Sequence, residues 1–347
     1  MKLGRFALKS LAAAALGAVA FGSAHAAEFT LRYAHFWPSN SKVHTELFEA
    51  WAKSVEKASN GRIAVQLFPA QTLAKAEGSY QAMVNGVADI VSTVQGYTTG
   101  RFPLTQIAEF PGIGNSASQT GCVLQSLYDQ GLLNSEYSDA HVLYMFSTGP
   151  GMIHTRNKLV KTPEDLKGMR IRNPAVIPGQ ILQKAGARTA SMPAPEAYES
   201  MQRGVIDGVV FPWEAVQVFR LIELTRYHTE IPLYSTAFVT AMNKRTYDRL
   251  PPDLKKVIDD HSGPEWQRRA GAVFDSLDIS GRERAVADKQ EIYTIKDPLA
   301  TPDWGPILKG VIDEYLETLK KQNLPGEKVY EAAQKAKESC PVSPSAS

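Results

Sequence analysis

The sequence SYQAMVNGVADIV at residues 79–91 aligns without a gap with AYESMQRGVIDGV at residues 197–209. Both segments read as a helix, a glycine stop and a buried strand, and both follow a β-like run. Identical residues pair Tyr80 with Tyr198, Met83 with Met201, Gly86 with Gly204, Val87 with Val205 and Asp89 with Asp207. Chance, or convergence between βαβ units, is one explanation of this match. Because the order of elements also agrees, we favour two similar lobes with a binding cleft between them.

The residues around the first copy predict a parallel α/β lobe. Residues 29–34 alternate as a strand, and residues 62–68 and 88–94 predict two more. A helix between the first two strands would carry one apolar stripe, formed by Val43, Leu47, Trp51 and Val55. Strands that alternate with helices are typical of right-handed βαβ units in a parallel sheet.

The residues around the second copy predict another lobe of the same kind. Strands are expected at 169–172 and 208–211, with a helix at 179–186 between them. Residues 233–243 read as a β segment that crosses back to the first lobe. From Pro251 onward helical periodicity dominates. The fold class is therefore predicted to be α/β, with two lobes.

Residues 1–26 have the pattern of a secretory signal peptide. A short Ala-rich apolar run at 11–20 precedes the small-x-small cleavage pattern Ala24-His25-Ala26. The positive charges before that run are Lys2, Arg5 and Lys9. This pattern predicts export to the periplasm and a mature chain that starts at Ala27, and the alternative is a retained N-terminal anchor.

The charge balance argues against several classes of partner. The chain has 38 Lys and Arg residues, three of them before residue 10, and 36 Asp and Glu residues. A nearly neutral mature chain does not indicate binding to nucleic acid or to an anionic membrane surface. No later apolar stretch is long enough for a transmembrane helix, and the length suffices for two lobes with separate cores.

The two cysteines, Cys122 and Cys340, leave two possibilities open. In an oxidising compartment they either form a disulfide that ties the C-terminal tail to the body or remain two free thiols. Their separation does not resemble a zinc or redox motif.

Local signatures of catalysis are missing from the sequence. It lacks the G-x-S-x-G, H-E-x-x-H, P-loop and G-x-G-x-x-G motifs, and GIGNSA at 112–117 lacks the third glycine of the dinucleotide fingerprint. The histidines show no metal-ligand spacing. We therefore expect a binding protein with no catalytic residues, cofactor or metal. An enzyme whose site is assembled only in space is the alternative.

Three segments resemble the substrate-binding proteins of tripartite ATP-independent periplasmic (TRAP) transporters, the DctP family. TPEDLKGMRIRNP at 162–174 resembles the family pattern D-L-K-G-x-K-I-R-x-P. NGRIAVQLFPAQTLA at 60–74 and AYESMQRGVIDGVVFPWEA at 197–215 resemble two further family segments. Together with the element order, the resemblance extends over nearly the whole mature chain.

The resemblance implies a two-lobe receptor that closes on a carboxylate ligand and delivers it to integral membrane permease subunits. It also implies a long helix that spans both lobes. Lobe I would comprise residues 27–149 and 238–277, and lobe II residues 150–237 and 278–335, with a C-terminal tail at 336–347.

The family's ligand-clamping arginine falls on Arg172. A guanidinium holds a carboxylate with two parallel hydrogen bonds, which a lysine cannot reproduce. The alternative for Arg172 is an ordinary surface ion pair. Arg170, two residues earlier, is read as a solvated residue outside the site.

Several residues that differ from the family pattern indicate the chemical class of the ligand. Val209-Val210-Phe211-Pro212-Trp213 replaces a stretch whose Asn touches the ligand in many relatives, and Met152, with His154 nearby, replaces a second arginine of sialic-acid binders. The first strand leads into His35-Phe36-Trp37, and Ser92, Thr93, Gln95 and Tyr97 are the expected polar groups opposite Arg172.

Apolar and aromatic groups at these positions favour an aromatic or apolar monocarboxylate over a polyhydroxylated or dicarboxylic acid, whose polar groups would lose water without replacement. Phe211 and Trp213 could instead belong to the lobe core. The alternative ligands are a C4-dicarboxylate, an oxo-acid or a sugar acid.

Overall fold

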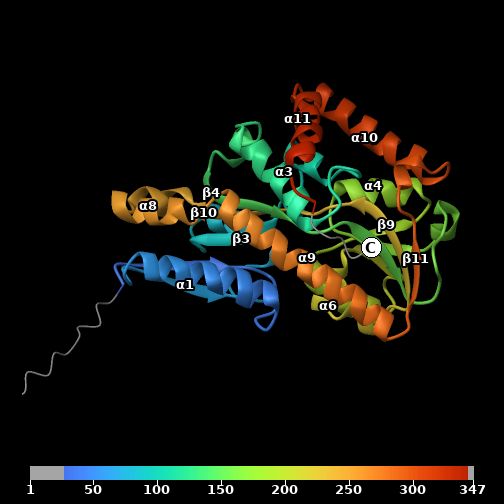
Figure 1. Cartoon of the computed structure of the whole chain (residues 1–347), viewed down its shortest axis with the longest axis horizontal. Helices are drawn as coiled ribbons and strands as arrows, with labels where there is room; N and C mark the ends of the chain where they lie inside the picture. Colours follow the sequence, from blue (N-terminus) through green and yellow to red (C-terminus); the bar gives the residue numbers. More distant parts are fainter. Residues whose placement is uncertain (1–26, 343–347) are drawn as a thin grey trace, which may run out of the picture.

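The computed structural model describes residues 27–342. The predicted signal peptide at 1–26 and the last tail residues, 343–347, lie outside the described residues. Two separate sheets dominate the described part, and helices pack around both of them (Figure 1). The predicted α/β class with two lobes is confirmed.

The first sheet has the strand order β2-β1-β3-β10-β4. Its strands are β1 (Phe29–Ala34), β2 (Ile63–Phe68), β3 (Ile90–Val94), β4 (Ala140–Ser147) and β10 (Ala237–Asn243). The first three run parallel, whereas β10 is antiparallel to both of its neighbours. The predicted apolar stripe lies on a π-helical turn (Val43–Phe48) and on α1 (Glu49–Ala58), and each of its side chains is buried.

The second sheet has the strand order β11-β9-β5-β8-β6-β7. Its strands are β5 (Gly151–Thr155), β6 (Arg170–Asn173), β7 (Arg188–Ser191), β8 (Gly208–Phe211), β9 (Tyr227–Tyr234) and β11 (Glu291–Thr294). Helices α2 (Ser79–Val84) and α5 (Ala197–Gln202) precede the equivalent strands β3 and β8, while α4 (Val176–Lys184) joins β6 to β7.

The repeat found in the sequence corresponds to an equivalent unit in each sheet. In both sheets a strand at the repeat's end, β3 or β8, pairs parallel with an earlier strand, β1 or β6. Asp89 accepts hydrogen bonds from the backbone N and the Nε of Arg32, both at 2.9 Å. Asp207 likewise accepts hydrogen bonds from the backbone N and the Nε of Arg170, at 2.8 and 3.0 Å. The two aspartates therefore have the same structural role. Arg170, which we expected to be a solvated residue outside the site, lies at the surface and forms an ion pair with Asp207.

The chain crosses between the sheets where β4 leads to β5 and again between Tyr234 and Ala237. The segment 233–243, expected as one crossing strand, thus divides into the end of β9 and all of β10. The predicted lobe-spanning helix is α9 (Pro264–Ala287), which packs on α3 (Ala117–Asp129) at one end and on α6 (Trp213–Val218) at the other (Figure 1). Two short helices precede it, α7 (Lys244–Arg249) and α8 (Pro252–Asp260).

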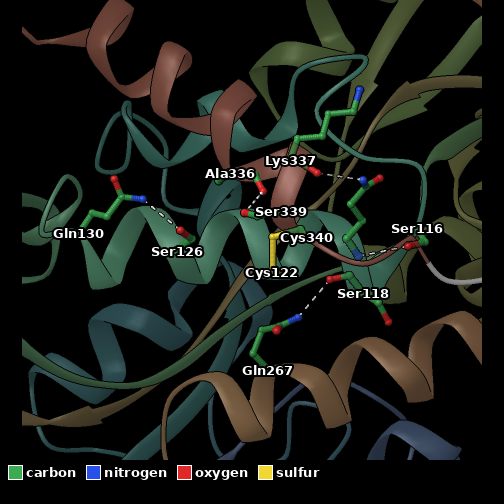
Figure 2. Close-up of a disulfide and its surroundings, with 11 residues drawn as sticks. Ser116, Ser118, Cys122, Ser126, Gln130, Gln267, Ala336, Lys337, Ser339 and Cys340 are labelled. Atoms are coloured by element: carbon green, nitrogen blue, oxygen red, sulfur yellow. Dashed lines mark hydrogen bonds between the residues drawn. A yellow bond between two sulfur atoms is a disulfide. The ribbon is translucent and has the colours of Figure 1, made fainter.

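The two C-terminal helices pack on earlier helices of the two lobes. α10 (Trp304–Lys321) packs on α4, and α11 (Gly326–Ser339) packs on α3. Helix α11 continues beyond residue 335, where we expected the second lobe to end. Cys340, directly after α11, forms a disulfide with Cys122 in α3 (Figure 2). This disulfide settles the question that the sequence left open.

Among the helices of residues 27–342, none is both long and apolar enough to cross a membrane.

Candidate ligand-binding site

Arg172 is a fully buried cation on the last strand but one of the second sheet. It lies on β6, between β7 and β8, and its side chain is 0% exposed. Its Nε donates to the carbonyl of Met192 at 2.9 Å. Its Nη1 and Nη2 reach the carbonyl of Val210 and the hydroxyl of Tyr97 only at 3.5 Å. The two terminal nitrogens therefore keep donor capacity for a stronger acceptor.

No Asp or Glu within residues 27–342 forms an ion pair with Arg172. Burial of a charge without a counter-ion is costly, and a buried pair that loses one partner is strongly destabilised. The alternative of an ordinary surface ion pair does not fit, because the residue is neither exposed nor paired. An anionic ligand would supply the missing charge and accept two parallel bonds.

An aromatic ring lies against the guanidinium, and further rings stack in sequence from it. The Arg172 Cζ lies 4.1 Å from the centre of the Phe211 ring, in cation–π geometry. The Phe211 ring stacks with that of Phe219 at 6.4 Å, and Phe219 with Phe36 at 6.3 Å. Phe36 in turn stacks on Trp37 at 4.0 Å. These rings form an apolar row that starts at the arginine.

A cavity lies between the two sheets along this row. Both lobes and both crossing segments contribute to its wall, which comprises Phe36, Trp37, Val94, Tyr97, Thr148, Arg172, Pro174, Ala194, Phe211, Pro212, Glu214, Ala215, Phe219, Thr236 and Phe238. Apolar atoms dominate this wall, and the polar groups are few. This composition is typical of a site for a small organic molecule, while the cavity itself has a volume of only about 20 Å³, so a ligand enters it only when the wall residues move apart.

The two sheets are in direct contact beside the cavity. Tyr97, which follows β3, accepts a hydrogen bond from the backbone N of Ala194 at 2.9 Å and faces Arg172. Burial raises the pKa of the Tyr97 hydroxyl, while the nearby Arg172 lowers it. A Cβ placed on Gly96 would lie 2.6 Å from the Cβ of Ala175, so only glycine fits this approach. The protein is therefore in a closed state.

The structure brings part of the predicted site together. The predicted residues that line the cavity are Arg172, Phe211, Phe36, Trp37 and Tyr97. They come from segments far apart in the sequence, before residue 100 and after residue 170, which meet only because the lobes close.

Ser92, Thr93 and Gln95 require a correction. The Ser92 Oγ lies 2.6 Å from the hydroxyls of Tyr33 and Thr240, inside the first sheet. Ser79 donates to Thr93, and the Gln95 amide donates to the Tyr137 hydroxyl at 3.1 Å. Because β3 lies in the middle of a sheet covered on both faces, these polar side chains find buried partners within the lobe.

The two predicted histidines also lie in the protein core. The His35 Nε2 is 2.9 Å from the Nδ1 of His44. The His154 Nδ1 is 2.7 Å from the Nδ1 of His228, and its Nε2 is 3.0 Å from the carbonyl of Phe211. Burial lowers the pKa of His35 to about 3 and that of His154 well below its ordinary value. Both imidazoles are therefore neutral and structural.

Met152 and Trp213 line a different cavity, which also borders Glu230 and Asp278. The Trp213 indole donates to Glu230 at 3.1 Å and its ring packs edge-on against His154. The alternative that Phe211 and Trp213 belong to the lobe core therefore holds for Trp213 only. Phe211 instead faces the cavity at the arginine.

Glu214, Thr148 and Thr236 are cavity residues that the sequence did not single out. Glu214 is 2% exposed, and its Oε1 has no hydrogen-bond partner in the described part of the chain. Thr148 and Thr236 lie on the crossing segments, where the backbone N of Thr236 donates to the Thr148 Oγ1 at 3.1 Å. The position of Glu214, directly after the aromatic departure from the family pattern, was the one available signal.

Comparison with known proteins identifies similar chains. The family model for bacterial extracellular solute-binding protein, family 7 (DctP) matches residues 33–302. A solute-binding protein of Albidiferax ferrireducens is 27% identical over 282 residues, which cover 79% of this chain and 83% of the relative.

Two solved structures are similar over nearly their whole length. One is a TRAP solute-binding protein from an unidentified marine microbe, specific for aromatic acid ligands and solved with 3-hydroxybenzoate. It is 32% identical, with a TM-score of 0.85, and the match covers 91% of this chain and 99% of the other. The other is a TRAP solute-binding protein of Rhodoferax ferrireducens with copurified benzoate. It is 34% identical, with a TM-score of 0.85 and coverages of 89% and 98%.

Proposed function

The chain belongs to the bacterial extracellular solute-binding protein family 7, and from this premise we propose that it is the TRAP-transporter receptor for a small aromatic monocarboxylate. The observation that carries the proposal is the buried guanidinium of Arg172, which lacks a protein carboxylate among the described residues and opens onto a row of aromatic rings. The single guanidinium of the cavity suits a ligand with one carboxylate, and the apolar wall suits a ligand whose remaining part is apolar.

The wall of the cavity supports an aromatic body over a sugar or a dicarboxylate. Arg172 is the one basic residue among the lining groups, so a second carboxylate would be buried without a partner. A flat ring gains burial and stacking against Phe36, Phe211 and Phe219. The ligands of the two similar solved structures, 3-hydroxybenzoate and benzoate, are of this class.

Binding proceeds by closure of the two lobes. The acid enters an open form and pairs with Arg172, and residues of the first lobe such as Tyr97 then cover it. The lobe of the first sheet moves against the lobe of the second sheet, and the crossing segments near Thr148 and Thr236 act as hinges. Helix α11, although most of it falls in the range 278–335 predicted for the second lobe, moves with α3 of the first lobe, because it packs on α3 and is tied to it by the disulfide. The ligand shifts a pre-existing equilibrium towards the closed form because it contacts both lobes only there.

The protein performs no chemistry on its ligand and delivers it unchanged to the integral membrane permease subunits of a TRAP transporter. Its place of action is the periplasm, after removal of residues 1–26. Recovery of the acid unaltered after prolonged incubation with the protein tests the first point. Fractionation of cells that express the full chain tests the second.

A ligand screen on refolded, ligand-free protein tests the proposed ligand class. Thermal shift and calorimetry are run with benzoate, hydroxybenzoates, mandelate, succinate, an oxo-acid and glucuronate. A ligand at one hundred times its dissociation constant stabilises the protein by about 2.7 kcal/mol. We expect the aryl acids to produce this shift. Greater stabilisation by succinate, by the oxo-acid or by glucuronate would contradict the proposal and support the alternative ligand classes.

A further inference from the structure

Glu214 is the acidic residue of the cavity wall, and one of its oxygens has no hydrogen-bond partner in the described chain. It lies in α6, is 2% exposed and lines the same cavity as Arg172. Its backbone N donates to the Asp278 Oδ1 at 2.6 Å, which fixes the start of the helix. Its Oε1 lies buried and unbonded within residues 27–342. An unsatisfied buried oxygen costs about 1–3 kcal/mol, so the site gains when a donor arrives.

The carboxyl of Glu214 is neutral at pH 7. Burial raises its pKa to about 8, and the nearby Asp278 adds to this effect, while a hydrogen bond from the Trp37 side chain opposes it. A protonated carboxyl can donate one hydrogen bond and accept others. It therefore neither repels a bound carboxylate nor requires a cation as a partner. It can form a hydrogen bond with a neutral hydroxyl group of a ligand.

Aromatic rings line the cavity that Glu214 and Arg172 share. Arg172 lies on Phe211, which stacks with Phe219. In the same wall, Phe36 stacks on Trp37, whose side chain contacts Glu214. An acid whose carboxylate binds the arginine in this cavity therefore has the glutamic acid in the wall around the rest of its body.

We propose that Glu214 is a specificity-determining residue that hydrogen-bonds a hydroxyl group on the body of the ligand, so that the protein selects hydroxylated aryl acids. The inference rests on the proposed function and narrows its ligand class. The hydroxyls of Thr148 and Thr236 border the same cavity and are the other polar groups that a ring hydroxyl meets.

Calorimetry with matched pairs of acids tests this inference. The 2-, 3- and 4-hydroxybenzoates are each compared with the methylbenzoate of the same substitution, which has a similar shape but no hydroxyl. The readout is the ratio of the two affinities within a pair. For the wild-type protein we expect at least one isomer to show a ratio of about 10 in favour of the hydroxyl, the worth of one hydrogen bond in a buried site.

Substitutions at Glu214 give the decisive comparison. Glu214→Met is expected to reduce the ratio to about 1, whereas Glu214→Gln, which keeps a donor and an acceptor, is expected to preserve most of it. Glu109→Gln is the matched control. Glu109 is another buried glutamic acid with a raised pKa and an unbonded Oε2 in the described chain, but it does not line the cavity. The control should keep the wild-type ratio.

The possible outcomes separate the two proposals. If the wild-type protein binds methyl- and hydroxybenzoates equally, or if Glu214→Met keeps the preference, the role of Glu214 is refuted while the aryl-acid receptor stands. If no aryl acid binds the wild-type protein, the proposed function fails and the inference fails with it. Benzoate binding by each variant reports whether its site is folded.

Discussion

Substitution of Gly96 by alanine should weaken ligand binding by holding the lobes apart. The added Cβ would lie 2.6 Å from the Cβ of Ala175, whereas ordinary contacts begin at 3.4 Å. Both atoms are attached directly to backbone, so the two segments must separate by most of the 0.8 Å difference between 2.6 and 3.4 Å. Overpacking of this kind costs about 1–3 kcal/mol. Because only the closed form contains the contact, the cost appears in the dissociation constant, as a loss of roughly 5- to 150-fold.

Calorimetry with the best-binding aryl acid measures the effect of Gly96→Ala. Gly78→Ala is the control, because Gly78 has ordinary φ and no heavy atom of the described chain lies within 4 Å of its added Cβ. X-ray scattering on the ligand-saturated variant should show a more open particle than the wild type. An affinity equal to that of the wild type, with the same scattering curve, would show that closure does not bring Gly96 against Ala175 and would refute the reasoning.

Three further predictions concern the charge, the pH dependence and the disulfide. Arg172→Lys should lower ligand affinity at least 30-fold, about 2 kcal/mol, because an ammonium loses the forked geometry; wild-type affinity in a titration would contradict the clamp. Since folding raises the pKa of Glu214 from 4.5 to about 8, the folded state keeps a proton that the unfolded chain releases, so this group's contribution to stability falls as pH rises between those values. The melting temperature of Glu214→Gln relative to wild type should therefore increase from about pH 5 to about pH 8.5, and a constant difference would argue against the shift. Replacement of Cys122 and Cys340 by serine, which opens a loop with a sequence separation of 218 residues, should lower the free energy of unfolding by about 2–5 kcal/mol in urea titrations, with ligand affinity unchanged; an unchanged midpoint would count against a stabilising role.

The sequence predicted the fold because its signals are local and repeated. The four-residue spacing of Val43, Leu47, Trp51 and Val55 gave a helix with one buried stripe, as observed. The alignment that paired Asp89 with Asp207 identified two equivalent units, and the structure shows each aspartate holding the arginine of the neighbouring strand. Periodicity and short motifs depend on neighbours in the chain, so a sequence displays them directly.

The candidate site was only partly accessible in this way. The Arg172 assignment came from a motif, and its burial without a protein carboxylate in the described chain fits the predicted role. Ser92 and Gln95 were placed at the cleft because they follow the first copy of the repeat, residues 79–91. Whether such a side chain contacts the ligand or another residue of the same lobe depends on which layers cover the strand. Here the hydroxyls of Tyr33 and Tyr137 form hydrogen bonds with the two side chains.

The amino-acid sequence by itself determined the α/β class, the two-lobe repeat and the family, and it predicted Arg172 as the residue that binds an anionic ligand. Only the tertiary structure decided that Phe211 faces the candidate cavity while Trp213, two residues on, packs in the core, that Cys122 meets Cys340, and that Glu214 lines the same cavity as Arg172. The physical reason is that each of these contacts joins segments from different strands or lobes. Its geometry is set by how the sheets and helices pack, which no local pattern of residues encodes.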